Sequence, residues 1–237
     1  MALAAARGGA SAAGGARRWL PPVTGLFVTV LIISNIIAVK LVTIGPLVVT
    51  AAIVLFPVSY IVADVLTEVY GYAVARRTIW IGFLCNLVAV LAIVAGGLIP
   101  AAPFWDGQDA YDAILGYSSR LLVASFVAYL GGEFLNAFVL AKLKLRTGGR
   151  HLWLRTIGST LVGQALDSTV FVVVAFAGVL PTGNLVAAAV SQWAAKSLYE
   201  ALATPLTYLV VRFLKRSEGV DHYDHQTRFN PLALREG

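Results

Sequence analysis

Seven charged side chains lie inside segments that are otherwise apolar enough to cross a membrane. A charge near the centre of a bilayer costs roughly 3 kcal/mol on insertion scales. Such side chains therefore tend to face the interior of a helical bundle or a water-filled cavity, and they often mark the path of a substrate. The pattern predicts a polar central site in a small multi-helix transporter. The seven residues are Lys40, Asp64, Glu68, Glu133, Asp167, Lys196 and Glu200.

The densest polar cluster lies in residues 46–70. Tyr60, Asp64 and Glu68 are spaced four residues apart, so they lie along one face of a helix. One interpretation is that the two acids bind a ligand. The alternative is that they pair with one of the two lysines above, or with an arginine, for structural reasons alone. Buried ion pairs stabilise proteins only weakly, which favours the first interpretation.

Three later segments carry similar polar stripes. Each has polar side chains three or four residues apart, so each presents one polar face. We expect these faces to meet around a cavity. Lys196 and Glu200 could instead pair with each other, because they lie one helical turn apart. The stripes consist of Glu133 with Asn136, Gln164 with Asp167, and Lys196 with Glu200.

The composition is that of a protein embedded in lipid. Of the 237 residues, 59% are hydrophobic and 13% are charged, which is about half of the roughly 25% charged residues of soluble proteins. The mean hydropathy is +0.81. We predict an all-α polytopic membrane protein, a bundle of six transmembrane helices, at roughly 20 residues per span. The net charge of +6 does not indicate nucleic-acid binding, because the basic residues lie in the gaps between apolar segments.

The apolar segments and their Pro and Gly punctuation predict three parts of the chain. These are a disordered basic N-terminal extension (1–18), a six-helix transporter domain (19–216) and a polar, mobile cytoplasmic tail (217–237). Clusters of Arg and Lys follow every second span, which places both termini in the cytoplasm. The predicted spans cover residues 22–42, 46–70, 77–99, 117–143, 156–180 and 185–214.

Several kinds of chemistry lack the residues they need. The chain has no phosphate-binding loop of the form GxxxxGKS or GxxxxGKT, and hence no ATPase of its own. Its one cysteine, Cys85, and its three histidines form no cluster with metal-ligand spacing. No histidine lies within a predicted span to activate a nucleophile. We therefore expect no catalytic residue, no cofactor and no metal, and we do not expect an enzyme.

Several runs of the sequence resemble a known family. The longest is FPVSYIVADVLTEVYGYAVARR, and SNIIAVK precedes it. The later runs, in the same order, are RLLVASFVAYLGGEFLNAFVLAKLK, LWLRTIGSTLVGQALDSTVFVVVAFAG and WAAKSLYEALATPLTYLVV. Over residues 24–214 the chain resembles the queuosine precursor transporter family of bacterial inner-membrane proteins with six spans. The resemblance implies import of the 7-deazaguanine bases preQ0 and preQ1 for tRNA modification, with no direct contact to nucleic acid.

The resemblance and the polar stripes together suggest how such a base is held. A guanine-like base offers an N–H and an amino group side by side, and a carboxylate can accept both. A lysine would neutralise spare charge, amides would read the carbonyl edge, and aromatic rings could stack on the base, with plain packing as the alternative for each ring. The candidate substrate-binding residues are Asp64, Glu68, Asp167, Glu133, Asn136, Gln164, Tyr60, Phe56, Trp193 and Lys196. Those expected to anchor or gate the helices are Arg76, Arg77, Lys40 and Glu200.

Three alternatives stay open at this point. The protein could be a substrate-binding membrane subunit of a vitamin-type importer, which would need separate energising partners. The small-residue face of Ala124, Ala128 and Gly132 could pack helices within one chain or between the two chains of a homodimer. The motifs also leave open whether transport is coupled to protons or runs downhill.

Overall fold

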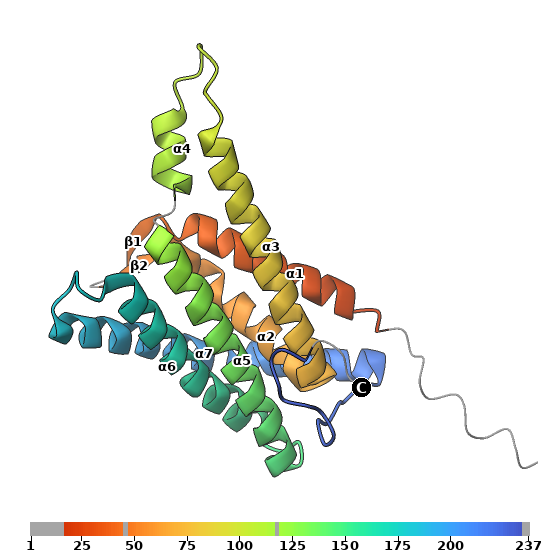
Figure 1. The fold of residues 1–237 in the computed structure, drawn as a ribbon. Coiled ribbons are helices and arrows are strands. Elements are labelled where there is room, and N and C mark those ends of the chain that lie inside the picture. Colours follow the sequence, from red (N-terminus) through yellow and green to blue (C-terminus); the bar gives the residue numbers. More distant parts are fainter. Residues whose placement is uncertain (1–16, 45–46, 117–118, 234–237) are drawn as a thin grey trace, which may run out of the picture.

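The computed structural model describes residues 17–44, 47–116 and 119–233, and long helices dominate them (Figure 1). Nearly all of the predicted N-terminal extension, residues 1–18, lies outside the described residues. The elements are α1 (Leu20–Ile37), β1 (Leu41–Ile44), β2 (Leu47–Thr50), a 3₁₀ turn (Ala51–Val54), α2 (Phe56–Tyr70), α3 (Tyr72–Leu98), α4 (Gln108–Leu115), α5 (Ser119–Thr147), α6 (Leu152–Phe176) and α7 (Thr182–Glu218).

Four stretches of the described chain are long and apolar enough to cross a membrane. They are α1, α3, α6 and the stretch Gln108–Thr147 that ends in α5. Helix α2 has only 15 residues, and α7 carries Lys196 and Glu200 among its apolar side chains. Each predicted span nevertheless corresponds to one long helix. The predicted helical class is confirmed, while six membrane crossings remain a prediction.

Residues 41–50 differ from the prediction, which placed 41–42 at the end of the first span, 46–50 at the start of the second and a break between them. They form an antiparallel hairpin, whose register runs from Leu41 opposite Thr50 to Ile44 opposite Leu47. Both strands are rich in Val, Ile and Thr, whose branched side chains favour extended backbone. The two runs are separated by Gly-Pro, a turn signal that the prediction placed between two helices instead of between two strands.

Helix α2 is the centre of the bundle. It contacts α1, α3, α5 and α7, and every residue from Tyr60 to Tyr70 is buried. Pro57 lies in its first turn, where a missing N–H costs nothing. Gly71 ends the helix with a φ of 86°, and a Cβ there would lie 2.2 Å from the ring of His222. Only glycine satisfies both demands.

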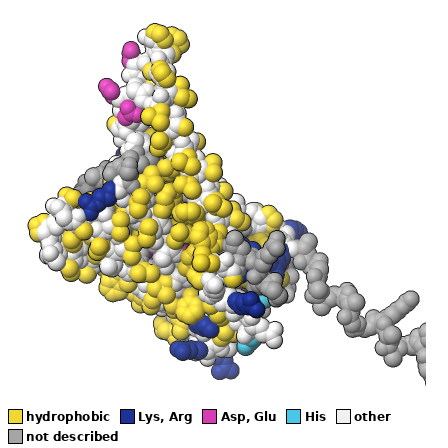
Figure 2. Space-filling model, in the orientation of Figure 1, with side chains coloured by type: hydrophobic (Ala, Val, Ile, Leu, Met, Phe, Trp, Pro, Cys, Tyr) yellow, Lys and Arg dark blue, Asp and Glu magenta, His cyan; other side chains and the backbone are white. Residues whose placement is uncertain are grey.

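The two ends of the molecule carry different charges. The last turns of α3 project from the bundle together with α4, a short helix in a segment predicted as a loop (Figure 1). Figure 2 shows acidic side chains on this projection and most of the visible Lys and Arg near the opposite end. At that opposite end, the N–H of Trp19 donates to Glu218 at 2.5 Å. The start of α1 and the end of α7 therefore lie together.

The described part of the tail packs against the bundle. Asp224 is only 2% exposed, and its two carboxylate oxygens accept the N–H of Tyr72 at 3.1 and 3.0 Å. The buried guanidinium of Arg76 donates to the carbonyls of Arg228 at 2.7 Å and Asn230 at 3.1 Å. The expectation of a mobile tail is wrong for these residues, because they supply the hydrogen-bond partners of the first turns of α3.

Replacing Asp224 by Ala should loosen the tail. The substitution removes the acceptor at the start of α3, and loss of such a cap costs about 1 kcal/mol. Trypsin should then cleave the purified protein after Arg228 about fivefold faster than it cleaves the wild type. The control is Asp109→Ala on exposed α4, which should leave the cleavage rate unchanged. Equal rates for the two variants would show that Asp224 does not hold the tail.

Candidate functional site

The two acids predicted on one face of α2 lie in different surroundings. Asp64 and Glu68 are one turn apart, and both are fully buried. Glu68 meets basic side chains at the end of the bundle where α1 begins and α7 ends. Asp64 meets amide and carboxyl groups. A shared helix face therefore does not imply a shared role.

Glu68 is surrounded by basic residues in a group that we call the inner clamp, made of Glu68, Lys144, Arg155, Lys215 and Asp221. Arg155 donates from Nη2 to Oε1 of Glu68 at 2.7 Å and from Nε to Oε2 at 3.2 Å. Lys215 donates to the same Oε1 at 2.7 Å. Both oxygens of Glu68 thus have charged donors, as expected of the structural alternative of pairing with an arginine.

Lys144 joins the inner clamp to the tail. Its ammonium group donates to the carbonyl of Glu68 at 2.5 Å, to Oδ1 of Asp221 at 2.5 Å and to the carbonyl of His222 at 2.7 Å, so all three of its protons are used. Partial burial acts to raise the pKa of Asp221, but hydrogen bonds from Lys144 and Lys215 outweigh it and lower the pKa below its usual value. Asp221 thus remains a charged partner for both lysines.

The sequence pattern did not predict the inner clamp. Lys144, Arg155 and Lys215 belong to the basic clusters that predicted the orientation of the spans, and the alternative of pairing with an arginine named no residue. The available signal was their position, because each lies where a helix enters or leaves the end of the bundle that Glu68 also reaches. Charge counting along the chain cannot show that three such ends meet at one carboxylate.

Asp64 is the centre of a second group, the polar site, which we define as Asp64, Asn136 and Glu200. Nδ2 of Asn136 on α5 donates to Oδ1 of Asp64 at 3.1 Å. Oδ2 of Asp64 and Oδ1 of Asn136 are buried without a hydrogen-bond partner among the described residues. Buried polar atoms are normally paired, so these free acceptors indicate a place for a ligand.

Glu200 approaches the polar site from α7. It is fully buried and lies close enough to Asp64 for the two carboxyl groups to interact. Neither of its oxygens receives a hydrogen bond from the described part of the chain. The polar site therefore brings together α2, α5 and α7, three of the helices on which the sequence predicted polar stripes.

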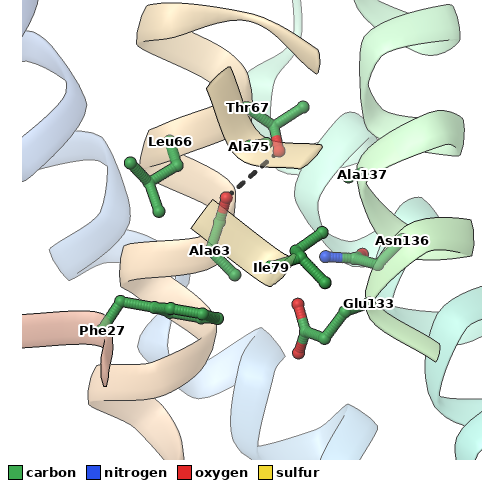
Figure 3. Close-up of a pocket in the computed structure, with 9 residues that line it drawn as sticks. All are labelled: Phe27, Ala63, Leu66, Thr67, Ala75, Ile79, Glu133, Asn136 and Ala137. Atoms are coloured by element: carbon green, nitrogen blue, oxygen red, sulfur yellow. Dashed lines mark hydrogen bonds between the residues drawn. The ribbon is translucent and has the colours of Figure 1, made fainter. Parts of the chain in front are cut away.

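A small cavity lies beside the polar site (Figure 3). Glu133 and Asn136 reach it from α5, while Ala63 and Thr67 line it from α2. Its free volume is about 10 Å³, which is room for about one water molecule. The expected cavity is thus not large enough for a bicyclic base in this structure. A base can bind here only after the helices move apart.

Helices α6 and α7 add an ion pair and further unpaired groups. Asp167 on α6 pairs with Lys196 on α7, and the two side chains are 18% and 21% exposed. Lys196 therefore does not pair with Glu200, the alternative that the sequence allowed. Three more buried polar atoms without a partner in the described chain belong to Gln164, Ser168 and Ser197.

The remaining predicted residues have varied surroundings. Tyr60 is buried within electrostatic reach of three of the carboxyl groups around the polar site. The indole N–H of Trp193 donates to a backbone carbonyl of α6 at 2.9 Å. Lys40 and Arg77 are exposed. The side chain of Phe56 lies outside the described part of the structure.

Glycines let α5 and α6 approach closely next to Asn136. A Cβ on Gly163 would lie 2.8 Å from the Cβ of Asn136 and 2.9 Å from the carbonyl oxygen of Gly132. Ala124 and Ala128, which share the small-residue face with Gly132, are buried as well. This face is therefore used within one chain and is not free to form a homodimer.

Replacing Gly163 by Ala should destabilise the bundle. The added methyl group must displace either the backbone of α5 or the Cβ of Asn136, and such overpacking costs about 1–3 kcal/mol. Thermal unfolding in detergent should show a lower midpoint than that of the wild type. Gly25→Ala is the matched control, because a Cβ at Gly25 meets nothing within 4 Å. A similar midpoint for both variants would contradict the close packing.

The fold and the polar site define a class of protein. Several apolar helices, long enough to cross a membrane, enclose carboxyl and amide groups that are buried and only partly paired. Ionisable groups at such positions are costly and typically mark the path of a substrate or ion. These are the features of a multi-pass membrane protein with the internal polar site of a transporter.

Comparison with known proteins agrees with this class. A family described as "Putative vitamin uptake transporter" matches residues 50–210, and the chain belongs to this family. The chain is 29% identical over 198 residues to the "Probable queuosine precursor transporter" of Bacillus subtilis (strain 168), covering 82% of this chain and 86% of the relative. It is 29% identical over 121 residues to the "Queuosine precursor transporter" of Escherichia coli (strain K12), covering 51% of this chain and 52% of the relative. No solved structure matches the chain significantly.

Proposed function

We propose that this protein imports queuosine precursors, the 7-deazaguanine bases preQ0 and preQ1, across the cell membrane. Two similar proteins carry the name of queuosine precursor transporters, and one of these matches covers 82% of the chain. The region that matches the uptake family, residues 50–210, contains the whole polar site. Import itself requires no catalytic residue and no cofactor.

The observation that carries this proposal is the pair of free acceptors on Asp64 and Asn136. A guanine-like base presents a ring N–H and an amino group side by side, which are two donors on one edge. Oδ2 of Asp64 and Oδ1 of Asn136 are acceptors without partners in the described chain, on side chains already joined by a hydrogen bond. A base that donates to both would satisfy them, and a hydrogen bond to a charged group contributes about 1.5–3 kcal/mol.

Neighbouring groups complete the proposed binding site. Gln164 would read the carbonyl edge of the base, and Tyr60 would stack on its ring. Glu133 borders the small cavity and would hold the aminomethyl cation that distinguishes preQ1. Glu68 leaves the proposed binding set, because the inner clamp already supplies donors to both of its oxygens.

We also propose that α1, α2, α3, α5, α6 and α7 cross the membrane with both termini in the cytoplasm. The contact of Trp19 with Glu218 supports an even number of crossings. Lys144, Arg155 and Lys215 lie at the same end of the bundle, and cytoplasmic ends are enriched in Lys and Arg. The residues before α1 and after α7 would then form the extension and the cytoplasmic tail.

A second candidate is a substrate-binding subunit that needs separate energising partners. The description of the matching family as a vitamin uptake transporter favours this candidate to some extent. The discriminating measurement is transport by the purified protein alone in liposomes. A subunit of this kind would bind base but would not move it across the bilayer.

The test of the proposed function is exchange of labelled preQ1 across liposomes that contain only this protein. Unlabelled preQ1 and preQ0 should compete with the label, because both present the donor edge that Asp64 and Asn136 would read. Adenine lacks that edge and should not compete. Absence of exchange, or equal competition by adenine, would refute the proposal.

A further inference from the structure

Glu200 is a buried acid that base recognition, as proposed above, does not use. It is fully buried, and both of its oxygens lack a donor from the described residues. Its neighbour Asp64 has one oxygen in the same condition. Ionising both of two buried carboxyl groups that interact costs much free energy. Such pairs therefore commonly share one proton.

Among the side chains that the structure describes, no spare positive charge lies beside the pair to neutralise it. Glu133 on α5 is a further acidic group within electrostatic reach of both Asp64 and Glu200, and Asp167 on α6 lies within reach of Glu133. Lys196 on α7 lies nearby, but it pairs with Asp167. Tyr60 on α2 faces the same carboxyl groups and carries no charge. Protonation is the remaining way to neutralise the pair.

Packing around the pair favours a proton over a metal cation. A cation such as Na⁺ needs several oxygen ligands arranged around a space of its own. The small cavity beside the polar site has a free volume of only about 10 Å³ and is lined by Asn136 but not by Glu200. The hydroxyl of Thr204, one turn along α7, already donates to the backbone carbonyl of Glu200. A proton needs no additional volume.

Asn136 gives independent support for a ligand at this place. It is 8% exposed, its amide donates to Asp64, and its carbonyl oxygen has no partner in the described chain. It therefore joins the carboxyl pair while leaving one acceptor free. A base and a proton would together satisfy the open atoms of Asp64 and Asn136 and one oxygen of Glu200: the base donates to Asp64 and Asn136, and the proton resides on Glu200.

We propose that Glu200, paired with Asp64, binds the proton that drives import, so that one proton enters with each base. The proton comes from the outer solution, adds to a carboxyl oxygen of Glu200, and leaves to the cytoplasm after the base has dissociated. When the base donates to Asp64, the shared proton stays on Glu200 and Asp64 is ionised. Import of a neutral base then moves one positive charge inward. This inference rests on the proposed function.

The test uses the full-length protein in liposomes, with labelled preQ0 as the neutral base. Exchange at equal pH on both sides reports transport without a driving force. An outside-acidic gradient of one pH unit, about 1.4 kcal/mol, should give up to about tenfold accumulation of base, and an inward Na⁺ gradient should give none. Glu200→Gln should lose the accumulation at whatever rate it exchanges base, so its accumulation is compared with its own exchange. Asp109→Asn on exposed α4 should keep both.

A second measurement needs no variant. Addition of unlabelled preQ0 to wild-type liposomes should acidify the lumen, as followed by a trapped pH dye, by about one proton per base. Exchange without any effect of the pH gradient, or accumulation driven by Na⁺, would overturn proton coupling while leaving transport intact. Full accumulation by Glu200→Gln would overturn the assignment of the coupling proton to Glu200. Absence of exchange in the wild type would instead refute the proposed function, and the coupling with it.

Discussion

Asp64→Asn is expected to lower base uptake about 100-fold or more while leaving the amount of protein unchanged. Asn has the same shape as Asp, so the packing of α2 is retained. The substitution removes the charge and can turn Oδ2 from an acceptor into an amide donor that faces the donors of the base. A loss of about 2.7 kcal/mol of binding, within the range for a hydrogen bond to a charged group, corresponds to this factor.

The measurement is uptake of labelled preQ1 in cells that cannot make the base, normalised to the amount of protein in the membrane. Asp109→Asn makes the same chemical change on an exposed helix and should not alter uptake. Wild-type uptake by Asp64→Asn would remove Asp64 from the binding site. Loss of the protein together with uptake would assign Asp64 a structural role instead.

Arg155→Met is expected to destabilise the bundle by about 3–5 kcal/mol, the usual effect of removing one partner of a buried ion pair. Arg155 is 1% exposed and contacts both oxygens of Glu68. Met keeps most of the side-chain volume, so the loss reports the missing guanidinium contacts rather than a cavity: Lys215 still pairs with Oε1 of Glu68, while Oε2 loses its donor. Denaturant unfolding in detergent should show a correspondingly lower free energy of unfolding.

The double variant Arg155→Met with Glu68→Gln should recover much of that loss, because Arg155 and the carboxylate oxygen that it alone contacted are then removed together. Arg146→Met, at an exposed position near the end of the same bundle, serves as the control and should change stability by less than about 0.5 kcal/mol. Strictly additive losses in the double variant would mean that Arg155 and Glu68 do not act as a pair.

The sequence was most informative about which residues are unusual. Seven charges in apolar segments pointed to a polar interior, and Asp64, Asn136 and Glu200 indeed meet there. The same reasoning grouped Glu68 with Asp64, because a spacing of four residues defines a helix face. The spacing does not define how far along the bundle each side chain lies, and four residues of helix rise by about 6 Å. Over that distance the surroundings change from amides and acids to Arg155 and two lysines.

Other differences arise from contacts that no local pattern contains. The apolar run in residues 41–50 suits a span or a hairpin equally well in hydropathy, and its branched side chains with the Gly-Pro turn decide for the hairpin. The tail looked polar and loose. Its partners, the start of α3 and the buried Arg76, lie about 150 residues earlier in the chain. Contacts between residues so far apart in the chain can be recognised only in the folded structure.

The tail contact has a consequence for how the protein is made. Residues that cap the start of α3 leave the ribosome about 150 residues later than α3 itself, since synthesis runs from the N-terminus. Until Asp224 emerges, the N–H of Tyr72 and the guanidinium of Arg76 lack the partners that the finished chain supplies. The junction between α2 and α3 is therefore completed only after all the later helices, α7 included, have been synthesised.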